Sequence, residues 1–181
     1  FDTIGYVLAY PQVPLVKTRM SKHLHYDDLP CGQNIIVGFG SWSGYNQEDS
    51  VLLNESAIQR NMFECYSYRT YKNEEMRKST TMIEEKFCNP KDLEITGGKH
   101  GDYTKLNKYG FVDLETKVVE DDIIIGKVSP VIHGKDKSQV IYKDSSTELK
   151  SNEHGRIDKI LVTKNSDGYN IYKTKIRHLC T

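Results

Sequence analysis

The stretch Gly44–Asn54, which reads GYNQEDSVLLN, is the most informative part of this 181-residue chain. It places two adjacent acids, Glu48 and Asp49, in a polar turn directly ahead of the apolar run Val51–Leu53. On an extended segment, neighbouring side chains point to opposite sides, so only one of the two carboxylates can face a given site. A solvated turn in front of a helix or strand is the plain alternative, and the sequence does not decide which acid points inward.

Short motifs surround this turn on both sides. Upstream lie Asp2–Thr3, the run YPQVPLV at 10–16 and the run LPCGQN at 29–34, and NESAIQR follows at 54–60. Farther along the chain come KHG at 99–101, DIIIGK at 122–127, SST at 145–147, NEHG at 152–155 and ILVT at 160–163. In this order and spacing the series resembles the second-largest subunit of multisubunit DNA-dependent RNA polymerases. The likeness is greatest to the eukaryotic polymerase II type or its large-DNA-virus homologue, and it covers essentially the whole chain.

The resemblance implies a mainly β fold in two regions. Residues 1–64 would belong to the hybrid-binding region and form part of a double-psi β-barrel. Residues 65–181 would form the wall, also called the flap, which is mostly β with short helices and lies at the upstream end of the RNA–DNA hybrid. The barrel follows from the resemblance and not from the periodicity of the sequence.

The resemblance also implies template-dependent RNA synthesis, in which a ribose hydroxyl attacks the α-phosphate of a nucleoside triphosphate. Two Mg²⁺ ions can clamp the attacking and leaving oxygens of such a displacement. In the family, aspartates of the largest subunit hold the first ion, and their Asp-x-Asp-x-Asp pattern does not occur in this chain. The Glu-Asp pair of the second subunit faces the second, substrate-borne Mg²⁺. Asp49 is thus expected to contact that ion, directly or through water, while Glu48 supports the local charge.

Four further residues are candidates for contact with nucleic acid: Lys17, Arg19, Gln47 and Lys99. A solvated basic face for the lysines and the arginine, and a turn-shaping role for Gln47, remain open alternatives. The partners that the resemblance implies are the largest and other polymerase subunits, the DNA template, the RNA–DNA hybrid, nucleoside triphosphates, and transcription factors at the wall. The expected location is the nucleus, or a viral particle or cytoplasmic factory for a viral owner.

Composition limits other classes of function. The 25 basic and 25 acidic residues balance, so no global basic signature for nucleic acid is present. The four cysteines include no CxxC pair, so no zinc site is expected. No apolar run approaches the roughly 20 residues of a membrane-spanning helix. The chain begins with Phe1 and stops at Thr181, before the lysine-rich segment of the family. We therefore expect a piece of a longer polypeptide that is inactive alone.

Local patterns predict mostly strands. Strands are expected at residues 6–10, 35–39, 63–71 and 122–127, and a hairpin is expected at 155–176 around Asp167–Gly168. Asn54 is a good N-cap for a short helix that reaches Asn61. Residues 72–86 are charged and polar and are predicted to be a solvated loop or a hairpin tip, and residues 130–151 are polar and are predicted to be a loop.

Two readings from other classes compete with the polymerase interpretation. One is a stand-alone β-rich module that binds proteins or nucleic acid without catalysis. The other is a hydrolase that uses Glu48 and Asp49 as acid and base. Glycoside hydrolysis needs carboxyl groups about 5–5.5 Å or about 6.5–9.5 Å apart across a substrate, and adjacent acids on opposite sides fit that requirement poorly.

Overall fold

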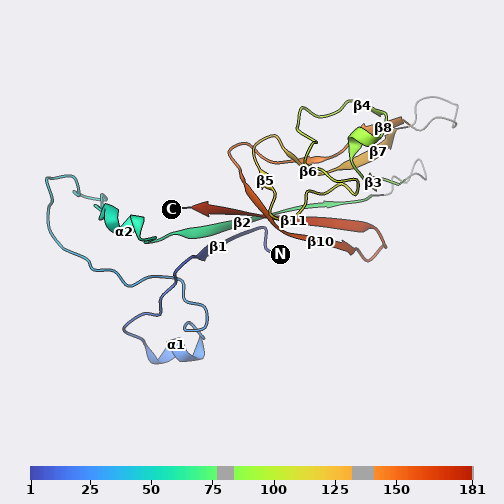
Figure 1. Cartoon of the computed structure of the whole chain (residues 1–181). Coiled ribbons are helices and arrows are strands. Elements are labelled where there is room, and N and C mark those ends of the chain that lie inside the picture. Colours follow the sequence, from blue (N-terminus) through green and yellow to red (C-terminus); the bar gives the residue numbers. More distant parts are fainter. Residues whose placement is uncertain (77–83, 132–140, 181) are drawn as a thin grey trace. The chain divides into compact units, whose positions relative to one another are not determined.

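The computed structural model describes residues 1–76, 84–131 and 141–180 (Figure 1). The chain is mainly β, which confirms the predicted class. It divides into two compact units. The first, here called the core unit, joins Phe1–Gly5 to Tyr68–His178, and the second, here called the turn unit, joins Tyr6–Ser67 to Leu179–Thr181.

The largest sheet has five strands, and its centre is a long hairpin. The strand order is β1 (Ile4–Leu8), β2 (Cys65–Glu74), β11 (Asn170–Cys180), β10 (Gly155–Lys164) and β5 (Lys117–Val118). Strands β10 and β11 pair antiparallel from Lys164↔Asn170 to Arg156↔Arg177, with a bulge between Ile157 and Lys159. At the tip, the side-chain oxygen of Asn165 accepts hydrogen bonds from the backbone N–H groups of Asp167 and Tyr169. The predicted hairpin is thereby confirmed, and both of its strands are longer than expected.

Two smaller sheets complete the strand content of the described residues. One has the order β3 (Lys86–Phe87), β7 (Lys127–Val131), β8 (Ile141–Asp144) and β4 (Ile95–Thr96), and the other pairs β6 (Ile123–Ile125) with β9 (Thr147–Glu148). The sheets do not close into a barrel in the described part of the chain. Residues 1–64, all described, contain the single strand β1. Their assignment to a double-psi barrel therefore stays a prediction.

The prediction of a loop over residues 130–151 was wrong where the structure describes this stretch. Strands β7, β8 and β9 run through it, and residues 132–140 lie outside the described part. The polar composition was misleading because some of these polar groups are buried and hydrogen-bonded. Asp144 and Ser146 are both buried, and Ser146 N–H donates to Asp144 Oδ1 at 2.8 Å. Residues 72–86 were predicted as a loop or a hairpin tip. Strand β2 continues to Glu74 and β3 begins at Lys86, and residues 77–83 between them lie outside the described part.

Three short helical turns are present in the described residues: α1 (Arg19–His23), α2 (Glu55–Gln59) and the 3₁₀ turn η1 (Pro90–Asp92). The Asn54 side chain caps α2 by accepting from Ala57 N–H at 3.1 Å, as the sequence predicted. The predicted strand at residues 35–39 is wrong. Its β-prone side chains find no neighbouring strand in the described chain, and Ile36 and Phe39 are almost completely exposed.

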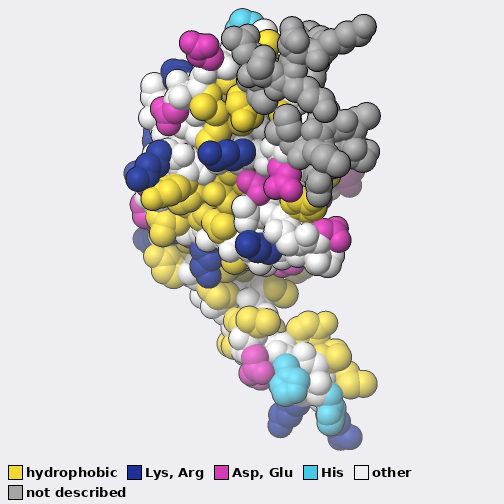
Figure 2. Space-filling model, turned by 90° about the vertical axis from the view of Figure 1, so that its right-hand side faces the viewer, with side chains coloured by type: hydrophobic (Ala, Val, Ile, Leu, Met, Phe, Trp, Pro, Cys, Tyr) yellow, Lys and Arg dark blue, Asp and Glu magenta, His cyan; other side chains and the backbone are white. Residues whose placement is uncertain are grey.

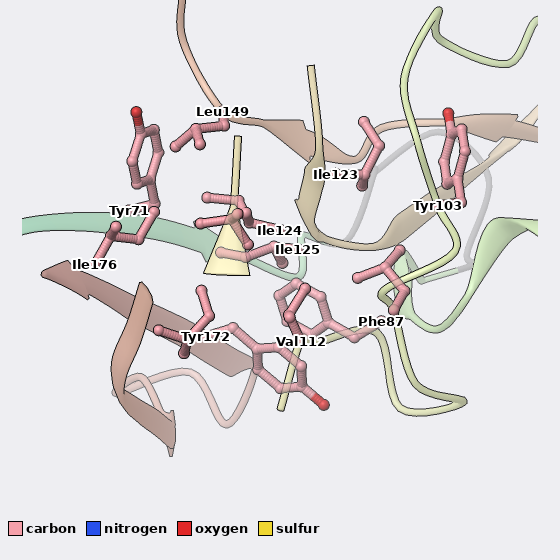
Figure 3. Packing of buried hydrophobic residues seen from close by; sticks show 13 residues of the cluster. Tyr71, Phe87, Tyr103, Val112, Ile123, Ile124, Ile125, Leu149, Tyr172 and Ile176 are labelled. Atoms are coloured by element: carbon pink, nitrogen blue, oxygen red, sulfur yellow. The ribbon is translucent and has the colours of Figure 1, made fainter. Parts of the chain in front are cut away.

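The hydrophobic core lies in the core unit and centres on β6 (Figure 3). Ile123, Ile124 and Ile125 are all fully buried, although successive side chains of a strand point to opposite faces. Both faces of β6 are therefore covered. Phe87 and Tyr172 stack beside this strand, with ring centroids 3.9 Å apart. The remaining members of the cluster come from β2, β5, β10, β11 and the loops between them.

Gly126, between β6 and β7, lets three backbone segments meet closely. A Cβ atom at this position would lie 2.4 Å from the Cys88 carbonyl oxygen. Gly126 N–H donates to the Gly110 carbonyl at 2.8 Å, and Cys88 N–H donates to the Gly126 carbonyl at 3.2 Å. Gly110 itself has φ +88°, a left-handed conformation that favours glycine. The contact leaves no space for a side chain at Gly126.

A buried carboxylate joins β8 to the loop that carries Lys99. Asp144 Oδ2 accepts hydrogen bonds from the Tyr103 hydroxyl and from Lys99 N–H, and Oδ1 accepts from Ser146 N–H at 2.8 Å. Burial opposes ionisation of Asp144, but the hydrogen bonds from Ser146, Tyr103 and Lys99 outweigh it and lower its pKa below the ordinary value of 3.8. Burial and the same carboxylate raise the pKa of Tyr103, so its hydroxyl stays protonated and can donate. The network thus fixes the backbone at Lys99.

We expect Gly126→Ala to lower the free energy of unfolding of the chain by about 1–3 kcal/mol, because the backbone of Cys88 must move to admit the methyl group. Gly98→Ala is the matched control, since its added Cβ would meet Ile95 Cδ1 at an ordinary 3.7 Å. Urea unfolding of the two variants and the wild type measures both changes. Equal stability of the two variants would contradict the close backbone contact.

We expect Tyr103→Phe to lower the free energy of unfolding at neutral pH by about 1.5–3 kcal/mol, because it removes a hydrogen bond to a charged, buried acceptor. The stability that follows from the lowered pKa of Asp144 is fully present above the unfolded pKa and is lost as the pH falls through the folded pKa. The difference from wild type should therefore shrink as the pH falls below about 4. Tyr109→Phe, at an exposed tyrosine, is the control and should change little at any pH. A Tyr103→Phe effect independent of pH would show that Asp144 does not ionise in the fold.

Candidate active-site turn

The acids that the sequence singles out lie in the second of two consecutive turns. Tyr45 N–H donates to the Trp42 carbonyl at 3.2 Å, and Ser50 N–H donates to the Gln47 carbonyl at 3.1 Å, so Glu48 and Asp49 occupy the centre of the second turn. The Asn46 side chain holds the first turn in place. Its Nδ2 donates to the Gly40 carbonyl at 2.6 Å, and its Oδ1 accepts from Trp42 N–H at 2.9 Å.

Glu48 has an unusual backbone conformation with φ +56°, and Ser43 in the preceding turn has φ +54°. A residue other than glycine in this left-handed region costs roughly 1–2 kcal/mol. The two acids therefore do not lie on an extended segment, and the premise that they alternate between opposite sides was wrong. The backbone geometry of the turn instead determines the directions in which the two carboxylates point.

Both acids are exposed, and their carboxylates are unpaired. Neither Glu48 nor Asp49 makes a side-chain hydrogen bond or an ion pair within residues 1–76, 84–131 and 141–180. Their charge is therefore not neutralised within the chain. Two adjacent unpaired carboxylates offer oxygen ligands of the kind that Mg²⁺ prefers.

The three basic candidates lie in different surroundings. Lys17 Nζ is 2.7 Å from Asp27 Oδ2 in a half-exposed pair, which is a weak and exchangeable kind of contact. Arg19 is exposed at the first position of α1. Lys99 belongs to the core unit, and its Nζ is 3.8 Å from Glu148 Oε1. No hydrogen bond or ion pair in the described part of the chain joins Lys17 or Arg19 to the two acids. The fourth candidate, Gln47, is exposed and contributes its carbonyl to the acidic turn.

A network of side-chain amides was missed by the sequence reasoning, although its residues belong to the motifs quoted above. Gln12 Oε1 accepts from Asn34 N–H at 2.9 Å, and Asn34 Nδ2 donates to the Val13 carbonyl at 3.0 Å. Gln33 Nε2 donates to the Tyr10 carbonyl, and its Oε1 accepts from Phe63 N–H, both at 2.9 Å. The amides thus tie three separate stretches of the turn unit together, and the only signal for them was the recurrence of Gln and Asn in two proline-containing runs.

A hollow of about 640 Å³ opens beside this network. Its walls include Gln12, Gln33 and Asn34 together with Ser56 and Arg60, which come from α2 and its C-terminal end. Amide, hydroxyl and guanidinium groups are the donors that proteins use to contact phosphate and sugar oxygens. The hollow is also lined by Ile35, Ile36, Leu52, Leu53 and Met62, so it offers both polar and apolar contacts.

The turn unit exposes large apolar side chains and buries none. No residue from 1 to 67 is buried, whereas Leu15, Val16, Leu29, Ile36 and Phe39 are each at least 84% exposed. On the face shown in Figure 2, basic, acidic and apolar side chains are interspersed, without a continuous basic surface. The electrostatics of this face agree with the balanced charge of the sequence.

Neither a complete metal cage nor a membrane helix occurs in the described residues. No group of three or more His, Cys, Asp or Glu side chains that could hold a metal ion is found there. No helix among these residues is long and apolar enough to cross a membrane.

Comparisons with known proteins agree on one family. The family model described as RNA polymerase Rpb2, domain 6, matches residues 1–180. The chain is 41% identical over 180 residues to DNA-directed RNA polymerase II subunit RPB2 of Encephalitozoon cuniculi, covering 97% of this chain and 16% of that protein. It is 41% identical over 179 residues to DNA-directed RNA polymerase II subunit 2 of Arabidopsis thaliana, covering 97% of this chain and 15% of the relative.

The similarity extends to a viral protein. DNA-directed RNA polymerase subunit 2 of Acanthamoeba polyphaga mimivirus is 34% identical over 175 residues, covering 96% of this chain and 14% of the viral protein. The chain thus spans about one sixth of the length of these relatives or less. Since the family model matches nearly every residue, the chain belongs to the RNA polymerase Rpb2, domain 6, family.

Proposed function

We propose that this chain acts in transcription as a segment of the second-largest subunit of a DNA-directed RNA polymerase. The family match across residues 1–180 carries this proposal, and the names of the relatives supply the activity. The assembled enzyme is a nucleotidyltransferase that copies a DNA template from nucleoside triphosphates. In this proposal the chain contributes the acidic turn at Glu48 and Asp49, and the aspartates that hold the first Mg²⁺ come from the largest subunit.

The acidic turn contributes to the second Mg²⁺ of the reaction, which arrives with the substrate. Mg²⁺ is commonly bound by one or two carboxylates and completes its shell with water and substrate phosphate oxygens. The exposed, unpaired carboxylates of Glu48 and Asp49 fit such a partial site. A Mg²⁺ ion bound there would stabilise negative charge on the leaving pyrophosphate oxygens.

The two acids have different roles in this proposal. Asp49 holds the ion, directly or through a water molecule, and Glu48 adds negative charge beside it. The backbone strain at Glu48 supports a functional reason for the turn, since strained conformations persist at sites where geometry matters. The Asn46 hydrogen bonds to Trp42 and Gly40 position the turn.

The remaining candidates act on nucleic acid without reading its sequence. In this proposal residues 1–64 belong to the hybrid-binding region and residues 65–181 to the wall. Lys17, Arg19 and Gln47 lie near the RNA–DNA hybrid, and the exposed Lys17–Asp27 pair can open for a phosphate. Lys99 lies near the upstream end of the hybrid or a transcription factor, on a backbone that Asp144 fixes. Phosphate contacts suit an enzyme that must accept any sequence.

The partners and location follow from the same proposal. The chain assembles with the largest subunit, which shares the Mg²⁺ site, and with the other polymerase subunits. The exposed apolar side chains of residues 6–67 support burial against such neighbours. The assembly works in the nucleus, or in a viral particle or cytoplasmic factory if its owner is a large DNA virus.

We expect Asp49→Ala in the assembled polymerase to slow single-nucleotide addition by roughly 10²-fold, in the range seen when one group that stabilises developing charge is lost. The rate should recover in part at high Mg²⁺ concentration, because the weakened ion site is then refilled. Quenched-flow extension of a preformed RNA–DNA scaffold measures the rate as a function of Mg²⁺.

Two matched variants separate the carboxylate from the backbone. Glu48→Gly removes the neighbouring carboxylate but suits the positive φ, so it should slow addition less than Asp49→Ala does. Glu94→Ala removes an exposed acid of the core unit and should leave the rate unchanged. If Asp49→Ala behaves like Glu94→Ala at limiting Mg²⁺, the assignment of Asp49 is wrong.

A further inference from the structure

Two cysteines from distant parts of the sequence lie side by side. Cys65 is the first residue of β2 and Cys180 is the last residue of β11, and these strands are neighbours in the five-stranded sheet. The Cys65 thiol donates to the Cys180 sulfur, with the two Sγ atoms 3.7 Å apart. The two residues are separated by 115 positions in the chain, so only the fold brings them together.

Counting residues from the far end of the strand pair puts the two cysteines at matching positions, Cys65 on β2 and Cys180 on β11. Glu75 N–H donates to the Asn170 carbonyl at 3.0 Å, at the other end of the same strand pair. Moving back along β2 and forward along β11 by the same number of residues leads from this pair to Cys65 and Cys180. Directly opposed residues of antiparallel strands have Cα atoms about 4.5–5.5 Å apart. Disulfides require about 4.4–6.8 Å, so a bond can form without rebuilding the strands.

The surroundings of the pair allow a small oxidant to enter. Cys65 and Cys180 are both half-buried, with sulfur atoms close to each other. Burial and the neighbouring Cys180 raise the pKa of Cys65, so less of it is thiolate at neutral pH and its reaction with a disulfide should speed up as the pH rises. The other two cysteines differ, because Cys88 is buried and Cys31 is exposed.

We propose that Cys65 and Cys180 are a reversible modification site that forms a cross-strand disulfide when a low-molecular-weight disulfide, such as oxidised glutathione, is supplied. The thiolate of one cysteine attacks the glutathione disulfide, a mixed disulfide forms, and one glutathione thiolate leaves. The second cysteine, as its thiolate, attacks the protein sulfur of the mixed disulfide and releases the other glutathione. The two protein thiols lose two electrons and two protons in total, and one glutathione disulfide becomes two glutathione thiols.

The bond would fasten the first residue of β2 to the last residue of β11 and close a long loop of the chain. Cross-links that close long loops restrict the unfolded chain most strongly. Disulfides in reducing compartments are mostly transient and redox-sensing, and a half-exposed pair remains accessible to reductants. The site therefore adds a reversible redox response to the five-stranded sheet.

The test uses the complete 181-residue chain, oxidised glutathione as the probe, and blocking of residual thiols with N-ethylmaleimide. Mass spectrometry of peptides made without reducing agent should find one dominant cross-link, between the peptides of Cys65 and Cys180. The cross-linked chain should run faster on a non-reducing gel, and dithiothreitol should reverse both changes. Cys65→Ser and Cys180→Ser should each abolish this cross-link, while Cys31→Ser and Cys88→Ser should retain it.

Two further measurements distinguish a specific loss of the cross-link from misfolding of the variant. Far-ultraviolet circular dichroism should be the same for Cys65→Ser and wild type. In concentrated urea the preference for the Cys65–Cys180 link should vanish, because it depends on the native sheet. Stable glutathione adducts on both cysteines without a link between them, or a dominant link to Cys31, would overturn the proposal.

Discussion

Side-chain amides hold residues 6–67 together, and the position of the acidic turn depends on that kind of bond. No side chain in this stretch is buried, so burial of apolar surface cannot specify its path. Gln12, Gln33 and Asn34 instead pair with backbone groups of distant residues. Asn46 pairs with the nearby backbone groups of Gly40 and Trp42 and so holds the turn that precedes Glu48. A segment specified by hydrogen bonds at its surface can adopt a strained turn and leave two carboxylates unpaired.

The core unit, in contrast, is held together by burial of apolar side chains. Ile123, Ile124 and Ile125 are fully buried, and strands from both ends of the unit pack around them. Buried polar groups such as Asp144 and the Glu85–Lys127 pair are satisfied there, whereas the hydroxyls of Thr70 and Thr174 have no hydrogen-bond partner among the described residues. A sheet region with a buried core, joined to a segment with little core of its own, suits a piece of a large assembly in which neighbouring chains cover the exposed apolar residues.

Much of the fold could be predicted from local patterns. The hairpin at 155–176 was predictable because two β-prone runs flank an Asp-Gly turn, and α2 because Asn54 is a strong cap. Ile35–Phe39 has equally good strand propensity, yet it has no partner strand in the described chain, and pairing is not encoded locally. Strands β8 and β9 were missed because burial of Asp144 and Ser146 depends on donors from elsewhere in the fold. For the site, the sequence identified the acids, but not the left-handed conformation of Glu48 or the amide network.

The most direct test of the account is to replace Mg²⁺ by Fe²⁺ in the assembled, substrate-bound polymerase and map where the chain is cut. When hydrogen peroxide is added, Fe²⁺ in the site is oxidised to Fe³⁺ and yields hydroxide and a hydroxyl radical, which cleaves the nearest polypeptide backbone. The account predicts cleavage within Gly44–Ser50 that requires a bound nucleoside triphosphate, since the substrate brings the second ion. Cleavage confined to other segments, or cleavage at Gly44–Ser50 that does not depend on the nucleotide, would contradict the placement of this turn at the substrate-borne metal.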